Sequence, residues 1–77
     1  MSLEEQIIDC AASAYMVSAE LISPETVVRA ELSPKSMSML AFVSSIENEC
    51  DIVIPLSQTS ELITIQDFID KARELGA

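Results

Sequence analysis

The residue of this chain that is best placed to do chemistry is Ser36, which stands at the start of a strongly apolar stretch. A serine that acts as an enzyme nucleophile needs a neighbouring base, and the chain contains no histidine to supply one. It also lacks a Gly-x-Ser-x-Gly motif and a glycine-rich phosphate loop. Ser36 is therefore not expected to act as a catalytic nucleophile.

Two interpretations of Ser36 remain. In the first, Ser36 is a helix N-cap, a position that serine fills often. In the second, its hydroxyl is exposed at the helix start, where another enzyme attaches a group, and a phosphodiester there would be stabilised by the positive end of the helix. On physical grounds alone the capping role is favoured, because capping serines are common.

Neither the cysteines nor the acidic residues indicate a metal site. Cys10 and Cys50 are far apart in the sequence and form no Cys-x-x-Cys pair, so two buried free thiols are expected. Glu47, Glu49 and Asp51 lack the spacing of a calcium-binding loop. A solvated acidic helix end that attracts basic partners is the better interpretation.

The charge of the chain narrows its possible partners. It has 13 acidic and 4 basic residues and a net charge of −9. Neither nucleic acid nor an anionic membrane is expected to bind, because both are recognised through lysine and arginine. No apolar run has the length of a membrane span, and the first residues, MSLEEQ, are acidic where a signal peptide is basic. We expect a cytoplasmic monomer that meets basic protein partners.

Length and composition predict a single all-α domain over residues 1–77. Hydrophobic residues make up 49% of the chain and aromatic residues are few, which favours an aliphatic core built from helices. Gly76 is the only glycine, and tight hairpin turns depend on glycine. The expected architecture is a small antiparallel-type helical bundle with three main helices, one short helix and a long loop between the first two main helices.

Apolar residues at helical spacing give the expected bounds of these elements. They are, in order, about residues 3–17, a loop over about residues 18–34, a helix from between 33 and 36 to about 49, a short helix over about 57–62, and a last helix from about 65. Ser2 with Glu5 forms a capping box at the first helix, and Thr64 with Asp67 begins the last.

The second main helix carries two groups of apolar residues on different faces. On a helical wheel, the face expected to point into the core comprises Met39, Phe42, Val43, Ile46 and Cys50. Met37, Leu40 and Ala41 lie on the Ser36 side, where a plain surface helix would carry charge. Unless a loop or the short helix covers them, such a cluster beside one serine indicates a contact surface.

The order of these features resembles the acyl carrier protein family over essentially the whole chain. Glu31-Leu32-Ser33-Pro34-Lys35-Ser36-Met37 stands where that family has its Asp-Ser-Leu motif. The helix behind it ends in clustered acids and Asp51-Ile52-Val53-Ile54-Pro55, and the last helix begins Thr64-Ile65-Gln66-Asp67, as in the family. Lys35 replaces the usual acid before the serine, and Met37 replaces leucine, which is a mild change. The second main helix is acidic only at its C-terminal end, where the general carrier of the family is more acidic, and this favours a specialised carrier.

The resemblance implies a carrier protein and not an enzyme. A phosphopantetheinyl transferase would attach 4'-phosphopantetheine to Ser36, and the arm would hold acyl intermediates as thioesters for acyl-transferring and chain-modifying enzymes of fatty-acid, polyketide or related biosynthesis. The residues expected to contact partners are Lys35, Met37, Leu40, Ala41 and Glu47. The residues that would line an acyl cleft, or otherwise simply form the core, are Val28, Phe42, Ile46, Ile54, Leu62 and Phe68.

The charge reversal at Lys35 leaves one alternative open. The chain would then be a carrier-like interaction module that is never modified and that docks a partner through its second main helix.

Overall fold

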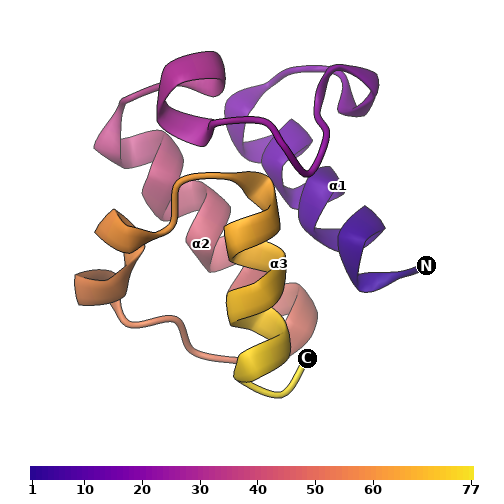
Figure 1. Ribbon diagram of the computed structural model, residues 1–77, viewed down its shortest axis with the longest axis vertical. Coiled ribbons are helices and arrows are strands. Elements are labelled where there is room, and N and C mark those ends of the chain that lie inside the picture. Colours follow the sequence, from indigo (N-terminus) through magenta and orange to yellow (C-terminus); the bar gives the residue numbers. More distant parts are fainter.

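The computed structural model describes residues 1–77 and is all-helical, which confirms the expected fold class (Figure 1). Three α-helices form the body of the molecule: α1 (Leu3–Tyr15), α2 (Ser36–Cys50) and α3 (Ile65–Glu74). The short elements are the 3-10 helices η1 (Ala19–Leu21) and η3 (Leu56–Glu61) and the single π-helical turn η2 (Val28–Leu32). The expected short third helix is thus present as η3. None of the helices combines the length and the apolar character needed to cross a membrane.

The ends of α1 are set by local hydrogen bonds. Ser2 Oγ accepts a bond from the Glu5 amide (3.2 Å) and a Glu5 carboxylate oxygen accepts one from the Ser2 amide (3.2 Å), which confirms the predicted capping box. The helix ends at Tyr15, two residues before the expected end. It stops there because Met16 adopts a left-handed conformation (φ 56°) and its amide donates to the carbonyl of Ala12.

The connection between α1 and α2 is more ordered than a structureless loop. Besides η1 and η2 it contains an antiparallel bridge between Val27 and Thr64. The Val28 amide donates to the Ile63 carbonyl (3.0 Å), and the Ile65 amide donates to the carbonyl of Thr26 (3.0 Å). Since Val28 is also fully buried, this connection is fastened to the start of α3 and holds η2 in a fixed place.

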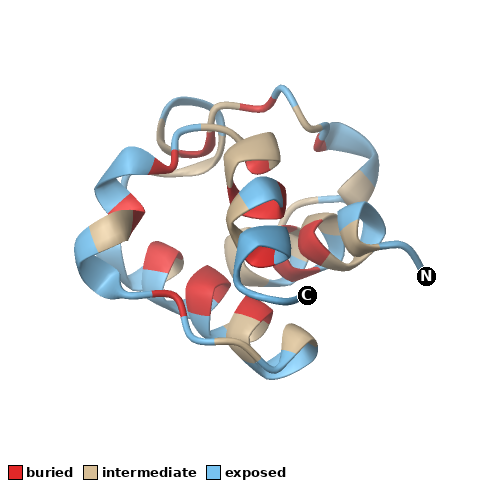
Figure 2. Cartoon of the chain, turned by 60° about the horizontal axis from the view of Figure 1, so that its bottom comes forward, coloured by how far each residue is buried: buried red, intermediate tan, exposed pale blue.

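The core lies between the inward faces of the three α-helices, as Figure 2 shows by the buried positions on each of them. At its centre the rings of Tyr15, Phe42 and Phe68 follow one another, with centroid distances of 5.8 and 4.7 Å. The predicted core face of α2 is buried except at Cys50, which is only half-buried. Leu75 lies beyond the end of α3 and is exposed.

The segment after α2 returns the chain to the core. Asp51 takes the left-handed conformation that ends the helix (φ 54°), and its amide donates to the carbonyl of Glu47. A carboxylate oxygen of Glu47 also accepts a bond from the Ile54 amide (2.8 Å). Ile54 is buried, so the acid at the end of α2 fixes the path of the chain toward η3.

Candidate functional site

Ser36 is the first residue of α2, and its side chain is exposed. The N-cap position belongs to Lys35, whose side chain makes no capping bond. The nearest side-chain bond runs from the Lys35 amide to Ser33 Oγ (3.2 Å) and leaves the Ser36 hydroxyl without a partner. The interpretation of Ser36 as an N-cap is therefore wrong, because the helix begins one residue too early for it. The hydroxyl is free and accessible at a helix start.

A pocket of about 230 Å³ opens beside Ser36, where the start of α2 meets the end of η2 and η3. Its walls mix apolar side chains, hydroxyls and two cations, and they contain no acidic residue; they are Arg29, Ser33, Pro34, Lys35, Ser36, Met39, Leu40, Leu56 and Thr59. The sequence analysis identified Ser36, Lys35 and Leu40 at this place but not the remainder of the wall. A small anionic or mixed polar and apolar group fits such a lining.

Arg29 holds the two sides of this pocket together. Its two terminal guanidinium nitrogens donate to the carbonyls of Leu62 (3.2 Å) and Thr59 (3.1 Å), which joins η2 to η3. The Thr59 hydroxyl in turn donates to the carbonyl of Leu56 (2.8 Å) within η3. Sequence reasoning missed this role, because the only signal was that Arg29 is the first basic residue, after a first third of the chain that carries only acidic charges.

Most of the residues expected to contact partners are accessible. Lys35 and Ala41 are exposed, and Met37 and Leu40 are 82% and 46% exposed although both are large and apolar. Neither the preceding loop nor η3 covers them. We call the surface formed by Lys35, Met37, Leu40, Ala41 and the 62% exposed Leu56 the Ser36 face. Glu47 is different, since it is half-buried and its carboxylate already accepts the Ile54 amide.

The six residues expected to line an acyl cleft all belong to the core. Val28, Phe42, Ile46, Ile54, Leu62 and Phe68 are each buried. They pack against one another and none of them lines a pocket in this structure. Met39, which is buried beside Phe42 in the core, also lines the pocket at Ser36. A route from that pocket into the core would therefore pass this methionine, whose flexible thioether side chain adapts readily to a guest.

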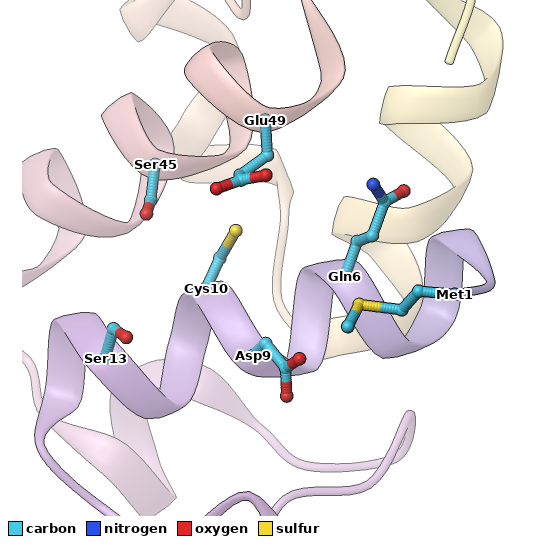
Figure 3. A pocket seen from close by; sticks show the side chains of 7 residues that line it. All are labelled: Met1, Gln6, Asp9, Cys10, Ser13, Ser45 and Glu49. Carbon is cyan, nitrogen blue, oxygen red and sulfur yellow. The ribbon is translucent and has the colours of Figure 1, made fainter.

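A second pocket, of about 370 Å³, lies between α1 and α2 (Figure 3). Its walls are Met1, Gln6, Asp9, Cys10, Ser13, Ser45 and Glu49, and none of these was a predicted site residue. The Cys10 thiol extends from α1 toward Ser45 and Glu49 on the facing helix (Figure 3).

Burial raises the pKa of the Cys10 thiol, the negative charge of Glu49 raises it further, and only a hydrogen bond with Ser45 opposes the change. The thiol therefore stays protonated at neutral pH, and a protonated thiol is a poor nucleophile and metal ligand. Both cysteines are free, and no cluster of side chains suited to a metal ion is present. The Cys10 thiol is thus a poor candidate for covalent chemistry, whereas the Ser36 hydroxyl is exposed.

Curated proteins similar to this chain are acyl carrier proteins. One from Chlorobium phaeobacteroides is 28% identical over 68 residues, which cover 88% of this chain and 87% of the relative. One from Campylobacter concisus is 24% identical over 76 residues, 99% of both chains. A third, from Syntrophobacter fumaroxidans, is 28% identical over 69 residues, 90% of this chain and 85% of the relative. No protein-family model matches the chain. At these low identities, similarity over nearly the full length supports the acyl carrier protein family that the motifs resemble.

Proposed function

We propose that this chain is an acyl carrier protein that holds acyl intermediates on a 4'-phosphopantetheine arm attached to Ser36. The observation that carries the proposal is the free, exposed hydroxyl of Ser36 at the first residue of α2. The full-length similarity to acyl carrier proteins supports it independently. In this role the chain catalyses nothing and serves enzymes that do.

The residues around Ser36 fit a phosphodiester. The first turn of α2 contains no acidic side chain, and the adjoining pocket contains Arg29 and Lys35. The amides at the start of a helix also favour an anion there. The charged side chains that line this pocket would therefore all attract an anion attached to Ser36.

The chemistry supplied by the arm is that of its terminal thiol, which carries an acyl group as a thioester. The chain contributes the attachment point and the rigid helix that presents it. A flexible tether of this kind delivers its cargo at a raised effective concentration to each enzyme that docks nearby. Lys35, Met37, Leu40 and Ala41 surround the attachment point and are the proposed contacts for the transferase and for the acyl-transferring and chain-modifying enzymes, with Glu47 at the far end of α2.

The six buried residues proposed as an acyl cleft have a second role under this proposal. An acyl chain that enters from the Ser36 pocket would displace Met39 and separate packed side chains such as Phe42 and Phe68, whose rings lie 4.7 Å apart. The cleft would therefore form on loading, with the cargo replacing contacts that the core makes with itself.

The test is an intact-mass measurement after incubation with coenzyme A, Mg²⁺ and a broad-specificity phosphopantetheinyl transferase. The wild type should gain the mass of one phosphopantetheine and Ser36→Ala should gain none. Ser38→Ala is the matched control, because Ser38 lies two residues further along the same helix and its loss should leave the mass gain intact. Modification of Ser36→Ala would overturn the assignment of the attachment site.

The Ser36 face also supports one alternative function, that of a carrier-like interaction module that is never modified. Lys35 takes the place of an acid that the family carries, and Met37 and Leu40 are exposed. A carrier-like module that docks a partner without being modified would use the same surface. This reading predicts no mass gain with the broad-specificity transferase or with one from the source organism, and partner binding that survives Ser36→Ala.

A further inference from the structure

We propose that the transferase acting on Ser36 docks on the Ser36 face with carboxylates opposite Lys35 and Arg29, although the chain as a whole is strongly acidic. The inference rests on the proposed function, since it concerns the partner that must reach Ser36. It reverses the expectation of a basic partner that the net charge of −9 favours.

The four basic side chains of the chain divide into two pairs. Lys71 and Arg73, near the end of α3, form ion pairs with Glu74 (2.9 Å) and Asp70 (3.9 Å). The remaining two, Arg29 and Lys35, form no ion pair and line the pocket at Ser36. None of the 13 acidic residues lines that pocket. The cations that are not neutralised by a carboxylate are thus gathered at the one place where an enzyme must approach.

The two cations present different binding groups. Arg29 uses two of its donors on backbone carbonyls, so its charge is held in a fixed position and its remaining N–H groups stay available. Lys35 is exposed, and its ammonium group makes no bond within the chain, so it can follow a partner's side chain. A carboxylate meets a fixed guanidinium and an adaptable ammonium here, which are the two donors best suited to it.

Exposed apolar side chains surround these cations. Met37, Leu40 and Leu56 are 82%, 46% and 62% exposed. Leu40 and Leu56 line the same pocket as Lys35, and Met37 directly follows Ser36 in α2. Protein interfaces combine an apolar centre with a polar or charged rim. The matching partner surface is therefore an apolar patch edged by aspartate or glutamate.

The range of electrostatic forces decides which charges the partner meets. The molecule measures 28 × 27 × 19 Å, whereas charges are screened over about 8 Å at physiological ionic strength. Acids on distant faces are therefore screened from a partner in contact with Ser36, and the local cations determine its orientation. The net negative charge acts mainly at low ionic strength, where it slows the approach of an acidic partner.

The experiment compares two charge reversals that change the net charge equally. The kcat/KM for transfer of phosphopantetheine from coenzyme A by the transferase of the source organism is measured for wild type, Lys35→Ala, Lys35→Glu and Arg73→Glu. Neither reversal is expected to unfold the chain, because the Lys35 ammonium makes no bond and the Arg73 ion pair is exposed. Far-ultraviolet circular dichroism checks this.

Lys35→Ala should lower kcat/KM about fivefold and Lys35→Glu about 30-fold, whereas Arg73→Glu should change it less than about twofold. Raising the ionic strength should reduce the difference in kcat/KM between wild type and Lys35→Glu, because salt screens the charges. An unchanged or faster reaction of Lys35→Glu, with the wild type still modified, would overturn this inference and leave the proposed function intact. A wild type that is not modified at all would overturn both.

Discussion

The helices α2 and α3 begin in opposite ways. At α3, Thr64 Oγ1 accepts a bond from the Asp67 amide (3.2 Å), and one Asp67 carboxylate oxygen accepts bonds from the amides of Ile63 (2.8 Å) and Thr64 (3.0 Å). At α2, Lys35 occupies the N-cap position without a side-chain bond, and the first turn carries no acid. One helix start is fully satisfied within the chain, and the other leaves its amides to outside partners.

The start of α3 carries the groups that stabilise a helix, whereas the start of α2 lacks them. A helix start is stabilised by a side-chain oxygen at the N-cap and by negative charge in the first turn, and α2 has a cation instead. Natural chains depart from such local rules chiefly where function requires it. The departure at α2 coincides with a free serine and a pocket whose charged side chains are both cations. The anion that would complete this helix start is thus expected from the attached arm or from a partner.

The first prediction tests the contrast by removing one hydroxyl from each helix start. Thr64→Ala should lower the free energy of unfolding by about 1–2 kcal/mol, because it leaves an amide of α3 uncapped. Ser36→Ala should change it by less than about 0.5 kcal/mol, because no hydrogen bond is lost. Urea denaturation of the unmodified protein measures both. Equal losses in the two variants would mean that Ser36 also stabilises its helix, and the contrast would fail.

A second prediction gives α2 the cap that it lacks. Lys35→Asp should raise the free energy of unfolding by about 1 kcal/mol, since it adds a capping oxygen and reverses an unfavourable charge at the helix start. Lys35→Ala is the matched control, because it removes the charge without adding an acceptor, and it should raise stability by a smaller amount. Thermal unfolding of the three proteins at one pH supplies the comparison. A loss of stability in Lys35→Asp would show that the lysine stabilises the fold in a way that its contacts do not reveal.

Features that depend on neighbours in sequence were predictable. The capping box of Ser2 with Glu5 and the N-cap of Thr64 follow from local sequence, and both are present. The structure adds that Asp67 completes a second capping box with Thr64. The core positions of α2, such as Phe42, follow from helical periodicity. These patterns were enough to predict the fold class, because the cap and the apolar periodicity of a helix both lie within its own short stretch of sequence.

Features that depend on exact boundaries or distant contacts were not predictable. The capping role of Ser36 was wrong because helix boundaries are uncertain by one or two residues, and the cap is Lys35. The early end of α1 rests on a left-handed Met16, a conformation that methionine rarely signals. The bonds of Arg29 reach carbonyls 30 and 33 residues away, so no local pattern marks this residue as a wall of the site.

The last and smallest predicted effect is a pH dependence of the free energy of unfolding. It arises at the start of α3 and not at the start of α2. The hydrogen bonds from the backbone of Thr64 and Ile63 lower the pKa of Asp67 below its ordinary value of 3.8. A carboxyl group whose pKa is lower in the folded state stabilises the fold above its unfolded pKa, and this contribution is lost as the pH falls through the folded value. The effect should be smaller than that of removing the cap, because water screens this accessible carboxylate.

The free energy of unfolding of wild type and Asp67→Asn should therefore differ at about pH 6, and this difference should shrink as the pH falls below the ordinary pKa of Asp67 and through its lowered folded value. Asp9→Asn is the control, because it makes the same substitution at an exposed carboxylate of α1 that accepts no hydrogen bond. A difference between wild type and Asp67→Asn that stays constant over this range would mean that the ionisation of Asp67 contributes nothing to the stability of the fold. Hydrogen bonding alone, and not charge, would then distinguish the start of α3 from that of α2, and the case for a missing anion at Ser36 would be correspondingly weaker.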